Sequence, residues 1–249
     1  WPLAISLSKD GLEYTTLNLV HGEITPMRYG GNYKSYGPQY PRGIQEGNGV
    51  PADGDLWVSY SVNKEDMWIS RIPVPVEINA SAHADDDFSK FGSIAELTNW
   101  NIYSPVWAPV SLEGAWLKLQ DKDPFDYAKV ERKIPASKEL KVSFDLLAEQ
   151  NDKGRLQIDF LDGNSIACSR LELTPDGIFR MKGGSRFANM MNYEAGKTYH
   201  VEAVLSTADR NIQVYVDGKR VGLRMFYAPV ATIERIVFRT GEMRTFPTV

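Results

Sequence analysis

The segment from Arg28 to Asn48 contains the residues best suited to chemistry on an anionic sugar. Arginine binds a carboxylate through two parallel hydrogen bonds, so Arg28 and Arg42 are candidates for holding an acidic group. The segment lies within residues 21–54, which are dense in Gly, Pro, Asn and Tyr and lack periodicity, and loops of this length are usually functional. The alternative is that Arg42 makes a structural pair within the loop. The other polar and aromatic residues of the segment are Tyr33, Lys34, Tyr36, Tyr40, Glu46 and Asn48.

Other polar groups in the sequence are expected to have structural or solvated roles. The sequence Asn-Lys-Glu-Asp at 63–66 is expected to be a solvated hairpin turn. The run Asp85–Asp87 offers the oxygen donors that calcium prefers, but no spaced ligand set accompanies it, so we favour solvated carboxylates and expect no cofactor. The histidines His21, His83 and His200 form no metal-binding motif, and His200 is expected to face away from the core side of its strand.

Three tryptophans, Trp100, Trp107 and Trp116, cluster ahead of the later strands. A sugar-binding platform uses such rings, but Trp buries the most area of any side chain, so we expect them to pack in the core.

Composition and charge exclude several classes of partner. The chain has 249 residues and a net charge of −4, with 6 basic and 9 acidic residues in the first 78. No part has the basic surplus that a phosphate backbone requires, so nucleic acid is not an expected partner. No apolar run is long enough to span a membrane. Cys168 is the single cysteine, so it has no partner for an internal disulfide, and its neighbours place it in a buried strand.

Two hairpins are predicted in the first part of the chain. Residues 3–8 and 13–20 alternate polar and apolar residues around an Asp-Gly turn, and residues 56–62 and 67–72 do so around the turn at 63–66. The sequence Pro-Val-Pro-Val at 73–76 is a stiff, extended connector. We therefore expect two domains, residues 1–78 and 79–249.

The second part reads as one strand after another. Alternating apolar residues predict strands near 140–146, 156–160, 178–181, 199–205, 212–216 and 233–239, with turn sequences such as Asp-Gly between them. The segment 93–97 is the one helix candidate. Regular strands with frequent turns predict an all-β sandwich or barrel.

From about Asp86 onward the chain resembles the concanavalin-like, laminin-G-type jelly-roll sandwiches that accompany many carbohydrate-active proteins. The resemblance rests on Asp87-Phe88, on residues 196–201 and on residues 211–221, where a strand ends in an Asp-Gly hairpin. In this superfamily the concave sheet binds glycan, holds calcium at its rim or packs on a neighbour, and the fold alone does not decide between these roles.

Residues 1–78 resemble the last blades of a sialidase-type β-propeller. The sequence Ser-Lys-Asp-Gly-Leu-Glu-Tyr at 8–14 is similar to the Asp-box (BNR) turn, with one residue missing before the glycine. In that turn the Asp side chain caps backbone amides and the aromatic residue packs beneath it. Residues 40–73 are similar to sialidase-like proteins of bacterial glycan-degrading systems. On this resemblance residues 1–20 supply two strands of one blade and residues 42–72 supply three of the next, with further N-terminal blades missing.

The resemblance also implies roles for the loop residues. In sialidases an arginine cluster holds the substrate carboxylate, and a Tyr–Glu pair serves as nucleophile and base. The implied catalytic residues are Arg42, Tyr40 and Glu46. The implied substrate-binding residues are Arg28, Tyr36 and Asn48.

The expected function is therefore the C-terminal portion of a sialidase-like glycoside hydrolase, with an accessory carbohydrate-binding sandwich. We expect the larger protein to be bacterial and secreted, periplasmic or on the cell surface, with a carbohydrate partner, in particular an anionic glycan. The 249 residues alone are expected to be inactive, because a propeller site draws on several blades. The alternatives are a non-catalytic glycan-binding module, a structural module, or the propeller of a polysaccharide lyase.

Overall fold

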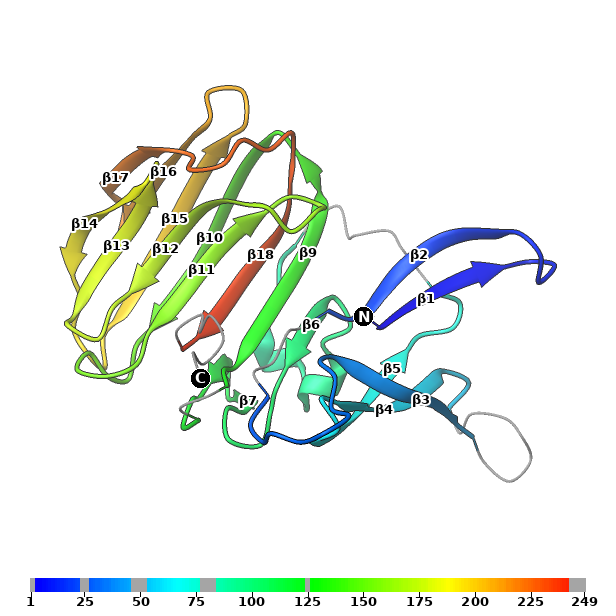
Figure 1. Ribbon diagram of the computed structural model, residues 1–249. Helices are drawn as coiled ribbons and strands as arrows, with labels where there is room; N and C mark the ends of the chain where they lie inside the picture. The colour runs from blue at the N-terminus through cyan, green and yellow to red at the C-terminus, as the bar shows by residue number, and fades with distance from the viewer. Residues whose placement is uncertain (1–2, 23–26, 46–52, 77–83, 124–125, 242–249) are drawn as a thin grey trace. The chain divides into compact units, whose positions relative to one another are not determined.

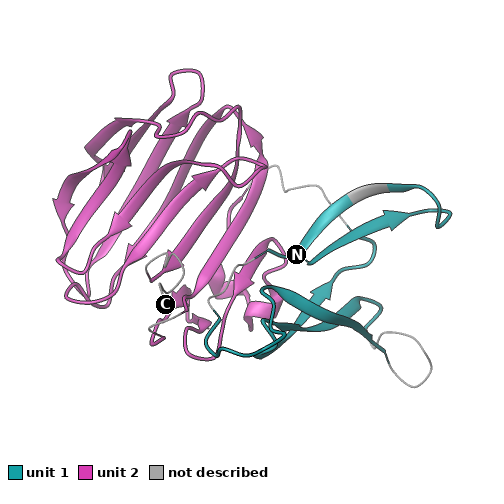
Figure 2. Cartoon of the chain, in the orientation of Figure 1, with its two compact units in different colours: residues 1–79, 244–249 teal, residues 80–243 magenta. Residues whose placement is uncertain are grey.

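The computed structural model describes residues 3–22, 27–45, 53–76, 84–123 and 126–241. These residues form two compact units, unit 1 within residues 1–79 and unit 2 within residues 80–243 (Figure 2). All long elements are strands (Figure 1). The segment 93–97, which we predicted as a helix, contains only a single 3-10 turn, Ile94–Glu96.

Unit 1 contains two small antiparallel sheets. Strands β1 (Leu3–Ser8) and β2 (Tyr14–His21) form a hairpin, and β3 (Pro38–Ile44), β4 (Leu56–Val62) and β5 (Asp66–Ile72) form a three-stranded sheet in that order. Strand β3 lies inside the segment that the sequence presented as irregular. Pro38 and Pro41 break the alternating pattern, and a register shift falls between Gln39 and Arg42, which fits an edge strand with a bulge.

The turn between β1 and β2 has the hydrogen bonds of an Asp-box. Asp10 Oδ1 accepts hydrogen bonds from the backbone N–H groups of Leu12 (2.8 Å) and Glu13 (3.0 Å). These bonds lower the pKa of the Asp10 carboxyl below its usual value, and the bond from Glu13 N has the largest effect. The Asp-box pattern places the aromatic residue, here Tyr14, beneath the turn. In this structure the Tyr14 side chain is instead exposed to solvent.

A buried aromatic cluster joins β2 to the three-stranded sheet. The ring of His21 contacts Tyr60 edge-on with centroids 5.4 Å apart, and it contacts Trp68 at 5.6 Å. The Tyr60 hydroxyl lies 3.2 Å from His21 Nδ1 and 2.7 Å from Ser70 Oγ, so a polar network holds the small core of unit 1 together.

Unit 2 is a β-sandwich of two antiparallel sheets, stacked face to face in Figure 1. The four-stranded sheet has the order β10-β15-β16-β17, and the seven-stranded sheet has the order β14-β13-β12-β11-β18-β9-β6. Strands β7 and β8 form a separate hairpin, and the short turn η1 (Phe88–Lys90) precedes η2 (Ile94–Glu96). The strands are β6 (Trp100–Tyr103), β7 (Val110–Glu113), β8 (Trp116–Leu119), β9 (Lys129–Ser137), β10 (Glu139–Leu147), β11 (Leu156–Leu161), β12 (Ala167–Leu173), β13 (Ile178–Gly183), β14 (Arg186–Asn192), β15 (Thr198–Ser206), β16 (Asn211–Val216), β17 (Lys219–Met225) and β18 (Ile233–Thr240).

The core of unit 2 lies between the two sheets. Alternate residues of facing strands fill it, for example Phe160 and Leu171 from one sheet and Val201 and Val214 from the other. Cys168 is fully buried there, and burial raises the pKa of its thiol to about 12. A smaller cluster around Val110, Ala128 and Val130 lies under the β7–β8 hairpin.

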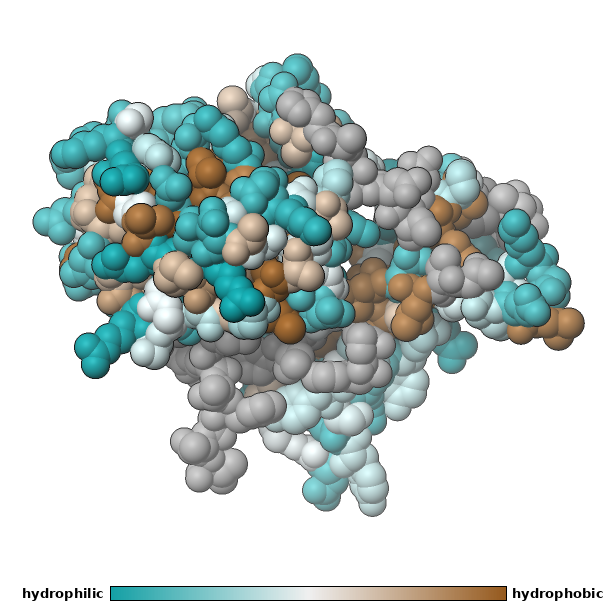
Figure 3. All heavy atoms as spheres, turned by 90° about the horizontal axis from the view of Figure 1, so that it is seen from above, coloured by the Kyte–Doolittle hydropathy of each residue, from teal (hydrophilic) through white to brown (hydrophobic). Residues whose placement is uncertain are grey.

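The face of unit 2 that Figure 3 shows is mainly polar. In Figure 3 hydrophilic side chains cover most of the sandwich that is visible at the left, and hydrophobic ones form separated patches. In the described part of the chain no helix is long and apolar enough to cross a membrane.

Candidate functional site

The candidate site is the outer face of the seven-stranded sheet, which we define as the side chains that point away from the core. Residues such as Ile158, Leu171 and Met181 face the core, so their neighbours in the same strands face outward. Strand register aligns these outward residues in two rows across all seven strands. The first row is Asn189, Arg180, Glu172, Gln157, Arg239, Lys129 and Tyr103. The second row is Phe187, Lys182, Arg170, Asp159, Val237, Glu131 and Asn101.

Ion pairs hold the middle of the outer face rigid. Arg170 binds Asp159 through two hydrogen bonds of 2.6 and 2.8 Å. Glu172, whose side chain is only 1% exposed, accepts hydrogen bonds from Arg155 and from Arg180, the latter at 3.0 Å. Its second oxygen, Oε2, is buried and has no hydrogen-bond partner among the described atoms. Charge-assisted pairs of this kind fix side chains in one conformation.

Aromatic rings lie against three of the cations on this face. The guanidinium of Arg180 lies 4.2 Å from the Phe187 ring, Lys182 Nζ lies 4.3 Å from the Tyr227 ring, and the guanidinium of Arg239 lies 3.9 Å from the Tyr127 ring. Burial, and to a lesser extent Asp159, raises the pKa of Tyr227, so its hydroxyl stays protonated and can donate a hydrogen bond.

The outer face carries more positive than negative charge. Its two rows contain five cations and three carboxylates, although the chain as a whole has a net charge of −4. Gln157, Asp159, Glu172 and Arg239 are buried. The polar and aromatic groups of this face that are open to a ligand therefore lie at its margin, at Lys182, Phe187 and Asn189. No cluster of three or more His, Cys, Asp or Glu suited to a metal ion occurs among the described residues.

Two carboxylates of the acidic run at 85–87, which we expected to be solvated, make structural contacts instead. Asp86 binds Arg132, with 2.7 Å between Oδ2 and Nε. Asp87 caps the turn η1 by accepting a hydrogen bond from Ser89 N.

The sequence-predicted site residues lie in unit 1. Tyr40 and Arg42 are both exposed on β3. Tyr40 has a positive φ of 54°, and Lys64 Nζ lies 5.6 Å from the centroid of its ring. Arg28 and Tyr36 lie in the loop that precedes β3. Arg28 donates a hydrogen bond to Asp66 at 3.1 Å, so its guanidinium takes part in a structural pair. Glu46 and Asn48 lie outside the described residues, and the catalytic and substrate-binding roles of all six remain predictions.

The β4–β5 turn is more than the solvated turn that we expected. The Glu65 side chain is only 3% exposed and accepts hydrogen bonds from Arg28 N (2.9 Å), Tyr29 N (2.8 Å) and Lys34 Nζ (2.6 Å). Burial raises the pKa of Glu65, but the bonds from Lys34 and the two backbone amides outweigh it and leave the pKa below its usual value. Asn63 is buried and accepts a hydrogen bond from Gly37 N at 2.8 Å. The turn therefore organises the loop that contains Arg28 and Tyr36.

The tryptophans and His200 divide between the core and the surface. Trp100 packs against Phe88 and Phe238, as expected, but Trp107 is 62% exposed and Trp116 is also partly exposed. His200 faces outward from β15, as predicted, and its Nδ1 lies 2.7 Å from Asp145.

Known proteins match both the second part of the chain and the chain as a whole. The model of the family described as "Sialidase-like, CBM domain" matches residues 100–249. A solved structure titled "Sialidase" is 97% identical to the chain with a TM-score of 0.95; the match covers 100% of this chain and 23% of that one. This chain thus spans about a quarter of the length of that sialidase.

A more distant match concerns the fold alone. The Crh5 transglycosylase is 11% identical with a TM-score of 0.51, and the match covers 65% of this chain and 69% of that one. A comparison with curated proteins gives no match.

Proposed function

The chain belongs to the sialidase-like CBM domain family, and from that premise we propose that unit 2 is a carbohydrate-binding module that holds glycan on its outer face. The observation that carries this proposal is the pair of polar rows that runs across all seven strands beside three aromatic rings. The buried pairs at Asp159 and Glu172 form a rigid floor, and Lys182 and Phe187 at the margin remain accessible to a ligand.

Glycan titration of the full chain tests the outer face. We expect Lys182→Ala and Phe187→Ala each to weaken binding by about tenfold, because hydrogen bonds to charged groups and ring stacking each contribute about 1–3 kcal/mol. Lys138→Ala is the matched control, since Lys138 is exposed in the turn between β9 and β10, outside the two rows. Equal affinities for all the variants would contradict the assignment of this face.

For the larger protein, the proposal is a secreted or periplasmic sialidase-like glycoside hydrolase in which unit 1 forms the last blades of a β-propeller. The Asp10 turn supports this assignment. So do the exposed apolar residues Leu17 (80% exposed) and Met67 (75% exposed), because two- and three-stranded sheets need neighbouring blades to bury such faces.

In that protein we assign catalysis to Tyr40, Arg42 and Glu46, and substrate binding to Arg28, Tyr36 and Asn48. Arg42→Ala in the full-length protein is expected to lower turnover of a sialylated substrate by at least about a hundredfold. Unchanged turnover would leave a non-catalytic glycan-binding or structural role for unit 1, and turnover of uronate polymers by elimination would favour a polysaccharide lyase.

A further inference from the structure

The last strand of the four-stranded sheet, β17, has an open edge. Among the described strands it pairs with β16 alone. Partners in an antiparallel pair alternate between positions that exchange backbone hydrogen bonds and positions that do not. Phe226 N donates to the carbonyl of Arg210 at 2.7 Å, so Arg224, two residues earlier, also bonds to β16. The backbone N–H and C=O groups of Leu223 and Met225 therefore point away from β16, toward the open edge.

The side chains at this edge also suit the addition of a further strand. Leu223 is 45% exposed and Met225 is 57% exposed, although both are large and apolar. They share the outer face of the sheet, because their partners in β16, Gln213 and Asn211, alternate with the core residues of that strand. An edge with unpaired backbone groups and exposed apolar side chains is a template for pairing with another chain.

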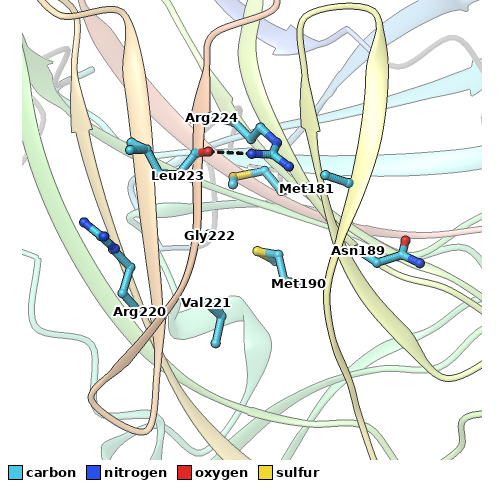
Figure 4. Close-up of a pocket in the computed structure, with 9 residues that line it drawn as sticks. Met181, Asn189, Met190, Arg220, Val221, Gly222, Leu223 and Arg224 are labelled. Carbon is cyan, nitrogen blue, oxygen red and sulfur yellow. Dashed lines mark hydrogen bonds between the residues drawn. The ribbon is translucent and has the colours of Figure 1, made fainter.

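Arg224 lies between these two residues and points the other way. In the β16–β17 register it is the partner of Ile212, which is fully buried in the core. Residues paired in this way share a face of the sheet, so Arg224 leaves β17 on the inner face. Its Nη1 donates a hydrogen bond of 3.0 Å to the carbonyl of Leu223 (Figure 4). The chain thus covers with its own side chain an acceptor that a further strand would use.

A glycine on the facing sheet makes room for Arg224. A Cβ atom at Gly183, in β13, would lie 2.8 Å from Cβ and Cδ of Arg224 and 2.9 Å from its Cγ. A side chain at this position would therefore displace the stem of the arginine. Gly183 is not among the residues with a positive φ, so the contact with Arg224, and not an unusual backbone conformation, is what requires glycine there.

Two copies of β17 match each other in an antiparallel pair about a two-fold axis. When Leu223 of one copy lies opposite Met225 of the other, the outward backbone groups of both residues have partners. The exposed side chains of the same residues then become neighbours on the outer face. This register also places the two Arg224 side chains directly opposite each other on the inner face, where like charges destabilise the pair.

We propose that the open edge of β17 is a pairing surface for a second copy of this chain, and that Arg224 keeps the two copies apart. Arg224 acts in two ways: it occupies the carbonyl of Leu223, and its charge opposes the same charge on the second copy. An inward-pointing charge is one of the devices that protect edge strands in sheet proteins. The inference concerns a different surface from the proposed glycan site and does not depend on glycan binding.

Sedimentation velocity of the full chain over a range of concentrations tests the role of Arg224. The wild-type chain is expected to sediment at the mass of one chain. Arg224→Val should shift toward twice that mass as the concentration rises, because the charge is removed and a β-branched residue suits a strand. Gly183→Ala, which displaces the stem of Arg224, should shift in the same direction by a smaller amount.

A charge exchange distinguishes the proposed register from general aggregation. Arg224→Glu alone should remain at the mass of one chain, because two carboxylates then lie opposite each other. An equal mixture of Arg224→Glu and the wild-type chain should form a mixed pair, since arginine then faces glutamate. Arg220→Val is the matched control. It removes the same charge from the same strand, but beyond the paired residues and beside the outward-facing Tyr215, so it should change nothing.

A proline variant locates the pairing surface. Leu223→Pro, added to Arg224→Val, removes an N–H group that faces the open edge and leaves the bonds to β16 in place. The chain should then return to the mass of one copy. Pairing that survives this change uses another surface and would overturn the proposal.

The other outcomes are equally decisive. The proposal is overturned if the wild-type chain already pairs, if Arg224→Val sediments as the wild type does, or if Arg224→Glu associates with itself as strongly as Arg224→Val. Absence of a mixed pair would also overturn it. Far-UV circular dichroism checks the fold of each variant. Gly183→Ala leaves the sequence of β17 unchanged, so it decides the question if Arg224→Val does not fold.

Discussion

At the scale of single residues, Glu172 is the most deeply buried charged residue of the outer face. It is buried between two arginines that come from different places in the sheet, Arg155 ahead of β11 and Arg180 on β13. A buried carboxylate with two cationic partners cannot be removed without leaving both cations uncompensated. Glu172 therefore holds the floor of the proposed glycan site.

Replacement of this carboxylate should destabilise unit 2. We expect Glu172→Gln to lower the free energy of unfolding by about 3 kcal/mol, because the amide cannot neutralise Arg155 and Arg180. The control is Glu194→Gln, which removes an exposed pair with Lys197 and should change the free energy of unfolding much less. Urea unfolding of both variants measures the difference, and equal midpoints would contradict the role given to Glu172.

At the scale of elements, the β4–β5 turn anchors the loop at residues 27–37 through Glu65. Protonation of Glu65 removes the charge that accepts hydrogen bonds from Lys34, Arg28 N and Tyr29 N. The pKa of Glu65 is below its usual value of 4.5, so its contribution to stability is complete above about pH 4.5. That contribution is lost as the pH falls from there through the lower pKa of the folded state.

An acid titration should therefore loosen this loop first. We expect the backbone amide signals of Arg28 and Tyr29 to shift together below pH 4.5 in the wild-type chain. In Glu65→Gln these signals should stay constant over the same range. Glu13→Gln, at an exposed position in the other hairpin of unit 1, provides the control. A titration of Arg28 and Tyr29 that persisted in Glu65→Gln would show that another group anchors the loop.

The elements also show how far the sequence alone could predict this structure. Strands with strict alternation, such as β10, β15 and β16, were predicted because one side of each faces the core. Strand β14 has the sequence Arg-Phe-Ala-Asn-Met-Met-Asn, which does not alternate, and it pairs with β13 across a register shift. A bulge at Tyr40 interrupts the alternation of β3 in the same way, so only the resemblance to a propeller blade indicated a third strand beside β4 and β5.

The candidate site was harder to predict than the strands. Its rows depend on register between segments far apart in the chain, such as Gln157 beside Arg239. Nothing local in the sequence marks Glu172 as buried. Local sequence reveals a site only when its residues are close together in the chain. The sequence therefore favoured the polar loop of unit 1, where the candidate residues lie between Arg28 and Asn48.

At the scale of the whole molecule, each unit has a core of its own among the described residues. Unit 2 has a large apolar core between its sheets, and unit 1 has the small cluster around Tyr60 and Val62. Small cores give little stability by themselves, so the two units should differ in how easily they open.

A cavity in one core should leave the other unaffected. We expect Leu171→Ala to lower the stability of unit 2 by about 2–5 kcal/mol, because Leu171 is fully buried. Hydrogen exchange followed by mass spectrometry should then show faster exchange in β11–β13 and unchanged exchange in β4 and β5. The reciprocal variant, Val62→Ala, should affect β4 and β5 only. Faster exchange in both units with either variant would mean that they unfold together.

The buried thiol of Cys168 has a practical consequence for labelling chemistry. With its pKa raised to about 12, almost none of it is thiolate at neutral pH, and thiolate is the form that reacts with maleimides and disulfide reagents. The native chain should therefore give no colour with a disulfide reagent, and the urea-unfolded chain should give one equivalent. A cysteine placed at exposed Lys138 or Lys9 would then be the single reactive position, so a fluorophore could be attached there without removing Cys168.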